Sequence, residues 1–244
     1  MKDYEELLKK VAKHGTVFRV PDTNILNFIH PILRHDVDFY LTGIEDMARL
    51  EKEYGHQTIY LFRLDAPTYN FFSEPCQALL LSLKELNHEV GLHIDRRNLL
   101  NNPQLEFTIN DLVSNFSLGL DSNLKFMSWH RPLPSDLNTE QKIYLNLTSL
   151  YSNNFWHKDL YLSDSAGDWN TAKELSLLNF CASKKYFQLL IHPEWWQKSN
   201  RAESFAYSSS KHILSNFSQL KNEIRTFDEL ELQVLIIKYL NRLS

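Results

Sequence analysis

Two aspartates separated by a single valine follow an apolar run in the stretch PILRHDVDFYLTG, residues 31–43. Side chains alternate between the two faces of an extended strand, so Asp36 and Asp38 would point the same way. Two like charges held together cost free energy, and such pairs are typical of sites that bind a cation or need a base. The spacing therefore predicts metal binding or acid–base chemistry at the end of this strand.

More polar residues stand at the carboxyl ends of later apolar runs: Arg63, His93, Asp95, His130, Arg131, Asp164 and His192. In α/β barrels, side chains from separate strands converge on a site at that rim, whereas the opposite rim serves stability. A single histidine at a strand end is more often a hydrogen-bonded structural residue than a ligand. Several of them on one rim indicate a functional site.

The elements that must position these residues alternate between β-rich runs and amphipathic stretches. Strands are predicted at about 30–36, 58–64, 88–94, 125–130, 160–164 and 186–196, and helices at 42–54, 74–87 and 104–119. An N-terminal helix with Tyr4, Leu7, Leu8 and Val11 on one side and two helices within 202–243 complete the pattern. Strands separated by helices indicate parallel pairing, and a barrel-like α/β arrangement is the favoured closure.

The composition favours a single globular domain over residues 1–244, because 43% of the residues are hydrophobic and no linker or repeat divides the chain. The net charge of −4 gives no basic face for nucleic acid. No run approaches the roughly 20 apolar residues of a membrane span, and no signal peptide is evident, so we expect a cytoplasmic protein. Cys76 and Cys181 lie in apolar surroundings and are expected in the core.

Carboxylates and imidazoles together suit a divalent metal such as zinc, which accepts nitrogen and oxygen ligands and keeps a position open for water in catalytic sites. One of Asp36 and Asp38 would then bind the metal, and the other could take a proton from the bound water. The alternative is a purely structural strand end in which Arg34 neutralises both aspartates. That alternative leaves the polar residues at the other strand ends unexplained.

Five motifs in order resemble the NodB-type polysaccharide deacetylases of carbohydrate esterase family four, and more closely their relatives with an RHDVD first motif. They are RHDVD, HEVGLH (88–93), WHRP (129–132), SDSAGDW (163–169) and LLIHPEWW (189–196), and the resemblance covers about residues 30–196. It implies a distorted (β/α) barrel of the deacetylase type, with the segment at about 202–243 as a helical C-terminal addition.

The resemblance also implies residue roles. Asp36 would be the general base, Asp38 and His93 metal ligands, Arg131 the residue that orients the base, and His192 the general acid. The fourth motif builds a wall of the substrate groove in the family, which implies substrate-binding roles for Asp164, Asp168 and Trp169. Trp129 and Trp195 lie beside other motifs, and aromatic faces commonly contact sugar rings, although a place in the core is the plainer alternative for any one tryptophan.

The sequence departs from the family pattern at the second metal histidine, which stands four residues after the first. Arg97 occupies that position. His130 is the first candidate for the missing ligand, and Asp95 is the second because it shares a strand face with His93.

The implied activity is metal-dependent hydrolysis of an N-acyl group, in particular N-acetyl, on an amino sugar of a glycan or glycan precursor. Zinc is the expected cofactor and a carbohydrate the expected partner. One alternative is a metal-dependent hydrolase of a non-carbohydrate amide, since a fold does not determine a substrate. Another is a catalytically silent glycan-binding or scaffold protein that lost its metal when arginine replaced the histidine.

Overall fold

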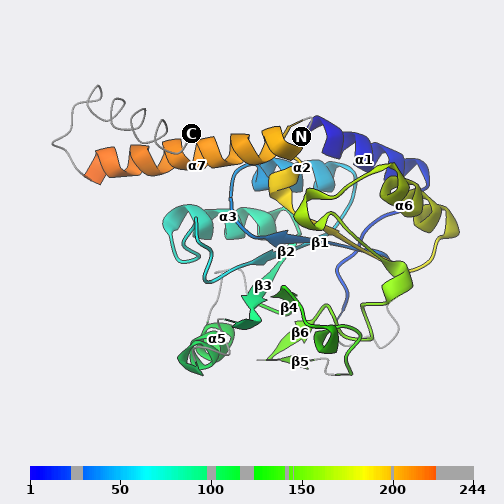
Figure 1. Cartoon of the computed structure of the whole chain (residues 1–244), viewed down its shortest axis with the longest axis horizontal. Helices are drawn as coiled ribbons and strands as arrows, with labels where there is room; N and C mark the ends of the chain where they lie inside the picture. Colours follow the sequence, from blue (N-terminus) through cyan, green and yellow to red (C-terminus); the bar gives the residue numbers. More distant parts are fainter. Residues whose placement is uncertain are drawn as a thin grey trace.

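Eight strands form the sheet around which the molecule is built (Figure 1): β1 (Ile32–Val37), β2 (Ile59–Phe62), β3 (Glu89–Asp95), β4 (Phe126–His130), β5 (Ile143–Tyr144), β6 (Leu147–Ser149), β7 (Tyr161–Ser163) and β8 (Gln188–Ile191). Their order is β5-β6-β4-β3-β2-β1-β8-β7. The strands from β6 to β7 run parallel, and β5 is antiparallel to β6. The sheet curls like half a barrel.

This computed structural model describes residues 1–22, 30–97, 103–115, 124–140, 143–144, 146–198 and 201–223. Within these ranges, no pairing joins the two edge strands β5 and β7. The predicted α/β class and the parallel pairing are therefore confirmed. The described strands form a curled open sheet rather than a closed barrel.

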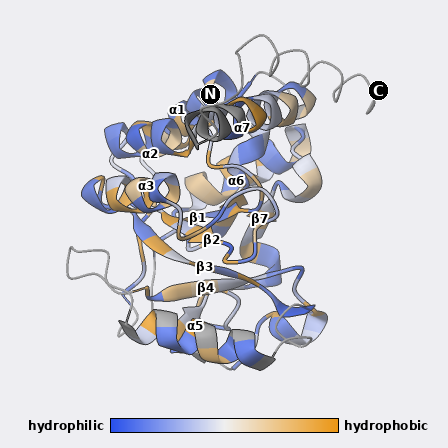
Figure 2. Cartoon of the chain, turned by 90° about the vertical axis from the view of Figure 1, so that its left-hand side faces the viewer, coloured by the Kyte–Doolittle hydropathy of each residue, from blue (hydrophilic) through white to orange (hydrophobic). Residues whose placement is uncertain are grey.

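The helices are α1 (Lys2–Lys13), α2 (Ile44–Glu53), α3 (Glu74–Glu85), α5 (Pro103–Asn115), α6 (Thr171–Ser183) and α7 (Arg201–Glu223). Short 3₁₀ turns are η1 (Pro134–Asp136), η2 (Lys158–Leu160), η3 (Ser165–Gly167) and η4 (Pro193–Trp195). The sheet lies between α5 on one side and α1, α2, α3 and α7 on the other (Figure 2). Among the described helices, none combines the length and apolar character needed to cross a lipid bilayer.

The strands alternate between two buried environments because successive side chains point to opposite faces. On one face, Leu33 of β1 and Leu189 of β8 pack with residues of α1, and Leu92 of β3 packs with residues of α3. On the other face, Ile32 and Ile59 form a small apolar cluster at the start of the strands. Polar side chains follow on that same face toward the carboxyl ends.

Gly91 allows two strands and a core side chain to approach closely. A Cβ atom at this position would lie 2.2 Å from the backbone oxygen of Phe126 and 2.6 Å from Leu61 Cδ2. A larger residue would push β4 away from β3, and these two strands carry His130 and His93. The glycine of the HEVGLH motif therefore serves the spacing of the site.

Most predicted elements match the structure to within a few residues, and the N-terminal helix buries the expected side chains Tyr4, Leu7, Leu8 and Val11. The strand predicted within 186–196 is observed as β8, and Pro193 begins the turn η4 after it. The prediction missed α6 and the β5–β6 pair. Of the two helices predicted within 202–243, α7 is observed, and residues 224–243 lie outside the described residues.

Candidate metal centre

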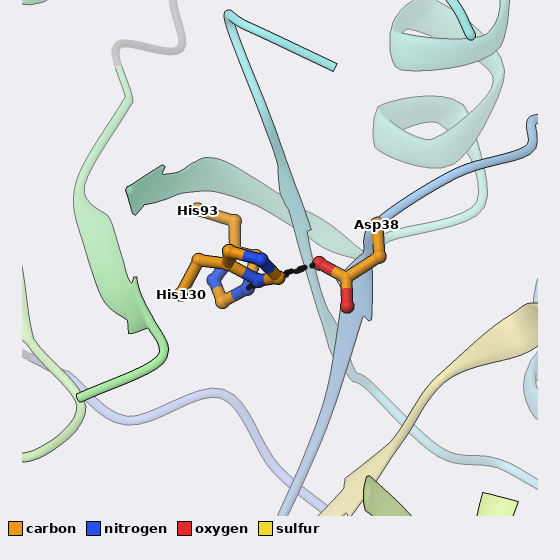
Figure 3. Close-up of side chains that lie close together, drawn as sticks. All are labelled: Asp38, His93 and His130. Atoms are coloured by element: carbon orange, nitrogen blue, oxygen red, sulfur yellow. Dashed lines mark hydrogen bonds and ion pairs between the residues drawn. The ribbon is translucent and has the colours of Figure 1, made fainter. Parts of the chain in front are cut away.

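Asp38, His93 and His130 converge at the carboxyl end of the sheet (Figure 3). Asp38 Oδ1 lies 3.2 Å from His93 Nε2 and 3.0 Å from His130 Nδ1. The two ring nitrogens are 3.2 Å apart. Tetrahedral zinc with bonds of about 2.0–2.1 Å would place its ligand atoms roughly 3.3 Å apart. The three atoms are thus spaced as ligands of one small cation.

The environment of Asp38 also fits a cation. Its Oδ1 is buried and makes no hydrogen bond with the described residues, although two ring nitrogens lie close to it. Burial by itself raises the pKa of Asp38, but the contacts with His130 and His93 outweigh burial and hold this pKa well below its usual value. The carboxylate is therefore ionised, as a metal ligand must be.

The other ring nitrogen of His93 is held by a short polar chain. Its Nδ1 lies 2.6 Å from Ser128 Oγ, and the Ser128 hydroxyl donates to Asp36 Oδ1 at 3.2 Å. This contact fixes the ring so that Nε2 faces Asp38, as partners outside the ligand set commonly do at metal sites. Ser128 was not among the predicted site residues, although it shares a strand face with His130, two positions later.

His130 faces the triad with Nδ1 and faces two arginines with Nε2. Arg131 Nε lies 2.9 Å from Nε2, and Arg63 Nη1 lies 3.4 Å from it. A guanidinium group only donates, so Nε2 accepts and the neutral ring carries its hydrogen on Nδ1. A cation at Nδ1 would require this hydrogen to move to Nε2, and Nε2 could then no longer accept from the two arginines.

Asp36 is held by Arg34 rather than by Arg131. Arg34 is fully buried, and its Nη2 lies 3.3 Å from Asp36 Oδ2 and donates to the Tyr151 hydroxyl at 2.6 Å. Its guanidinium carbon also lies 4.4 Å from the centre of the Tyr151 ring. In this structure Arg34 contacts Asp36, whereas Arg131, with a left-handed φ of 57°, contacts His130.

His192 approaches the triad from β8. Its Nε2 lies 3.8 Å from Asp38 Oδ2, and its Nδ1 lies 2.6 Å from Asp164 Oδ1. Burial lowers the pKa of His192, but the charge and hydrogen bond of Asp164, together with the charges of Glu194 and Asp36, outweigh burial and raise this pKa to about 10. Asp164 also accepts a hydrogen bond from Trp196 Nε1 at 2.7 Å. Asp164 thus holds the His192 ring through Nδ1, on the side away from Asp38.

A cavity of about 410 Å³ opens beside these groups. Its lining includes the catalytic candidates Asp36, Arg131 and His192, the metal candidates Asp38, His93 and His130, and the tryptophans Trp129 and Trp195. Three predicted substrate-binding residues do not line it. Asp164 lies behind His192, Asp168 is exposed and pairs with Lys173 at 2.9 Å, and Trp169 packs against Trp196.

The second-choice ligand Asp95 lies outside the triad. Its carboxylate accepts from the backbone N–H of Arg97 at 3.0 Å and lies 3.9 Å from Arg63 Nη2. His88, the first residue of the HEVGLH motif, also lies away from the triad. His88 Nδ1 lies 2.7 Å from Thr58 Oγ1, within a buried polar network around Glu51 on the helix side of the sheet.

No protein-family model matches the chain, and comparison with curated proteins of known function finds no match either. The function must therefore be argued from the site. The described site combines a buried Asp-His-His group with a second carboxylate and a third histidine around one cavity. Such a group can hold a divalent cation and offers both a proton acceptor and a proton donor beside it.

Proposed function

We propose that this protein is a metal-dependent hydrolase that removes an N-acyl group, in particular N-acetyl, from an amino sugar. The observation that carries the proposal is the convergence of Asp38, His93 and His130 within 3.0–3.2 Å of one another, beside the cavity that Asp36 and His192 also line. The resemblance of the five motifs to NodB-type deacetylases supports the same reaction and a barrel of that type.

Zinc is the proposed ion, and Asp38, His93 and His130 would hold it through one oxygen and two nitrogens. A divalent ion at this position supplies a Lewis acid that polarises the acyl carbonyl and makes water easier to deprotonate. Arg97 does not prevent this, because His130 provides the third ligand that the sequence pattern lacks.

Asp36 accepts the proton of the attacking water. Arg34 and the Ser128 hydroxyl hold its two oxygens in place, so that the carboxylate keeps one orientation in the cavity. His192 directly follows β8, the strand beside β1, and donates a proton to the departing amine. The Asp164 carboxylate keeps His192 protonated, which is the state a general acid needs.

A carbohydrate substrate is supported by the motifs and by Trp129 and Trp195, whose side chains line the cavity. Aromatic rings offer an apolar surface to a sugar. A hydrolase acting on a non-carbohydrate amide would use the same centre. A scaffold without activity would lack bound metal.

The test combines metal analysis with an assay of amine release. The purified chain is incubated with excess zinc, dialysed and analysed for metal, then assayed on N-acetylated hexosamines, their oligomers and simple acetamides. We expect about one zinc per chain and amine release from acetylated sugars only. Absence of zinc after incubation would refute the hydrolase, and release from simple acetamides alone would favour the non-carbohydrate substrate.

A further inference from the structure

Glu194 is a buried carboxylate in the wall of the catalytic cavity for which the proposed reaction has no use. It stands in the turn η4, two residues after His192, and its side chain lines the cavity together with Asp38 and His192. The residue is only 1% exposed. Neither carboxylate oxygen has a hydrogen-bond partner among the described residues.

An ionisable group in this position destabilises the folded protein. Buried polar groups are nearly always hydrogen-bonded, and a buried carboxylate without a partner loses its hydration with little in return. Burial raises the pKa of Glu194 to about 8, with smaller raising contributions from Asp38 and Asp164 and an opposite one from His192. Such strained groups concentrate at functional sites.

The fold itself gives no role to this carboxylate. His192 already has its own carboxylate partner, because Asp164 lies 2.6 Å from its Nδ1 and also accepts from its backbone N–H at 3.0 Å. The triad has its three ligand atoms without Glu194. The two free oxygens therefore remain for a molecule that enters the cavity.

We propose that Glu194 is a specificity-determining residue whose carboxylate accepts a hydrogen bond from a ring hydroxyl of the acylated amino sugar. This inference rests on the proposed function and adds the group that recognises the sugar rather than the acyl amide. A hydroxyl group is a neutral hydrogen-bond donor, and the Glu194 carboxyl group can accept from it whether it is ionised or protonated.

The neighbouring residues support a sugar at this position. Trp195 directly follows Glu194 in η4 and lines the same cavity. Its ring is stacked on Phe205 of α7 with centroids 5.2 Å apart, so that its position is fixed. A hydrogen-bond acceptor beside an apolar ring is the pairing that sugar recognition requires, since a sugar has both hydroxyl groups and an apolar face.

The experiment measures binding of methyl N-acetylglucosaminide and of analogues that each lack one ring hydroxyl. Isothermal titration calorimetry uses the full-length, zinc-loaded chain in the Asp36→Asn background, so that turnover does not consume the ligand. Glu194→Gln is compared with Glu194 itself and with the control Glu53→Gln, which changes an exposed glutamate of α2. Melting temperatures are measured for every variant.

At pH 9, above the raised pKa of Glu194, we expect Glu194→Gln to weaken binding of the full sugar roughly ten- to hundredfold, the effect of one hydrogen bond to a charged group. One deoxy analogue should bind equally well to the chain with Glu194 and to Glu194→Gln, because this analogue lacks the ring hydroxyl that contacts Glu194. The melting temperature should not fall, since the variant removes an unpaired buried charge. Glu53→Gln should change neither quantity.

Two results would overturn the inference. One is an unchanged affinity of Glu194→Gln for the full sugar, and the other is an equal loss for every analogue, which would indicate a general structural role. If Glu194→Gln does not fold, Glu194→Leu serves as the second variant with the same expectations. If the wild-type chain releases amine and Glu194→Gln binds the sugar normally, only this inference is refuted. If the wild-type chain neither binds nor hydrolyses acetylated sugars, the proposed function is refuted as well.

Discussion

Replacing Asp164 with asparagine should lower the pKa of His192 and weaken the fold. One Asp164 carboxylate oxygen lies 2.6 Å from His192 Nδ1, and the carboxylate also accepts from the His192 backbone N–H at 3.0 Å and from Trp196 Nε1 at 2.7 Å. All three donors point at this buried group. An asparagine offers one acceptor oxygen instead of two and directs an amide N–H at one of the donors.

The magnitude follows from the position of His192. Burial lowers its pKa, but the charge and hydrogen bond of Asp164, with smaller contributions from Glu194 and Asp36, outweigh burial and raise the pKa to about 10. The difference from the usual value of about 6.5 corresponds to about 5 kcal/mol in favour of the charged ring. Because the folded pKa is the higher one, this stabilisation is present below pH 6.5 and is lost as the pH rises toward 10.

In Asp164→Asn, burial is opposed only by the smaller contributions of the Glu194 and Asp36 charges, so the pKa of His192 should fall well below 10. The assay is an NMR titration of labelled histidines, with the His192 signal assigned from a His192→Gln variant, and urea unfolding at pH 6 and pH 10. Asp168→Asn is the control, because Asp168 is exposed and pairs with Lys173 at the surface. A His192 titration that is the same in Asp164→Asn and wild type would refute the reasoning.

Three further predictions concern other parts of the site and the fold. Asp38→Asn should lose zinc, and excess zinc should restore part of its activity. Asp36→Asn should keep zinc, and its turnover should fall roughly 10²- to 10⁴-fold. Metal analysis and amine release measure both variants, and the reverse result would exchange the roles of the two aspartates. Arg34→Met should lower the free energy of unfolding in urea by about 3–5 kcal/mol, because it leaves Asp36 as an unpaired buried charge, and adding Asp36→Asn should recover part of the loss. Burial lowers the pKa of His56 to about 4, so the free energy of unfolding should fall by about 3 kcal/mol as the pH drops from 6.5 to 4. In melting curves recorded across this pH range, His56→Gln should lack this loss of stability.

Local patterns in the sequence predict most of the fold. Apolar runs of strand length and helices with one apolar face are visible from side-chain spacing alone, as in α1, where the four predicted residues are buried. The helix α6 was missed because its apolar residues do not gather on one side, and only Leu177 and Cys181 are fully buried. The sheet edge β5–β6 was missed because two- and three-residue strands carry too little pattern.

The candidate metal centre was predicted because parallel strands bring their carboxyl ends to one edge of a sheet. Asp38, His93 and His130 could therefore be grouped before any distance was known, and the structure brings the three together. The sequence already favoured His130 over Asp95, and the tertiary structure gives the physical reason why Asp95 stands apart. Asp95 pairs with His130 in the register of β3 and β4, yet its carboxylate is taken by arginines outside the triad.

Side-chain partners were decided by the tertiary structure alone. Arg34 reaches Asp36 inside the curled sheet, while the left-handed backbone at Arg131 turns that arginine toward His130. Trp169 packs on Trp196 instead of lining the cavity, and Glu194 becomes a buried acceptor with no hydrogen-bond partner among the described residues. Spacing along the chain determines which face of a strand a residue takes, because that depends on neighbouring dihedral angles. Which group it meets there depends on the curl and register of strands far apart in the sequence.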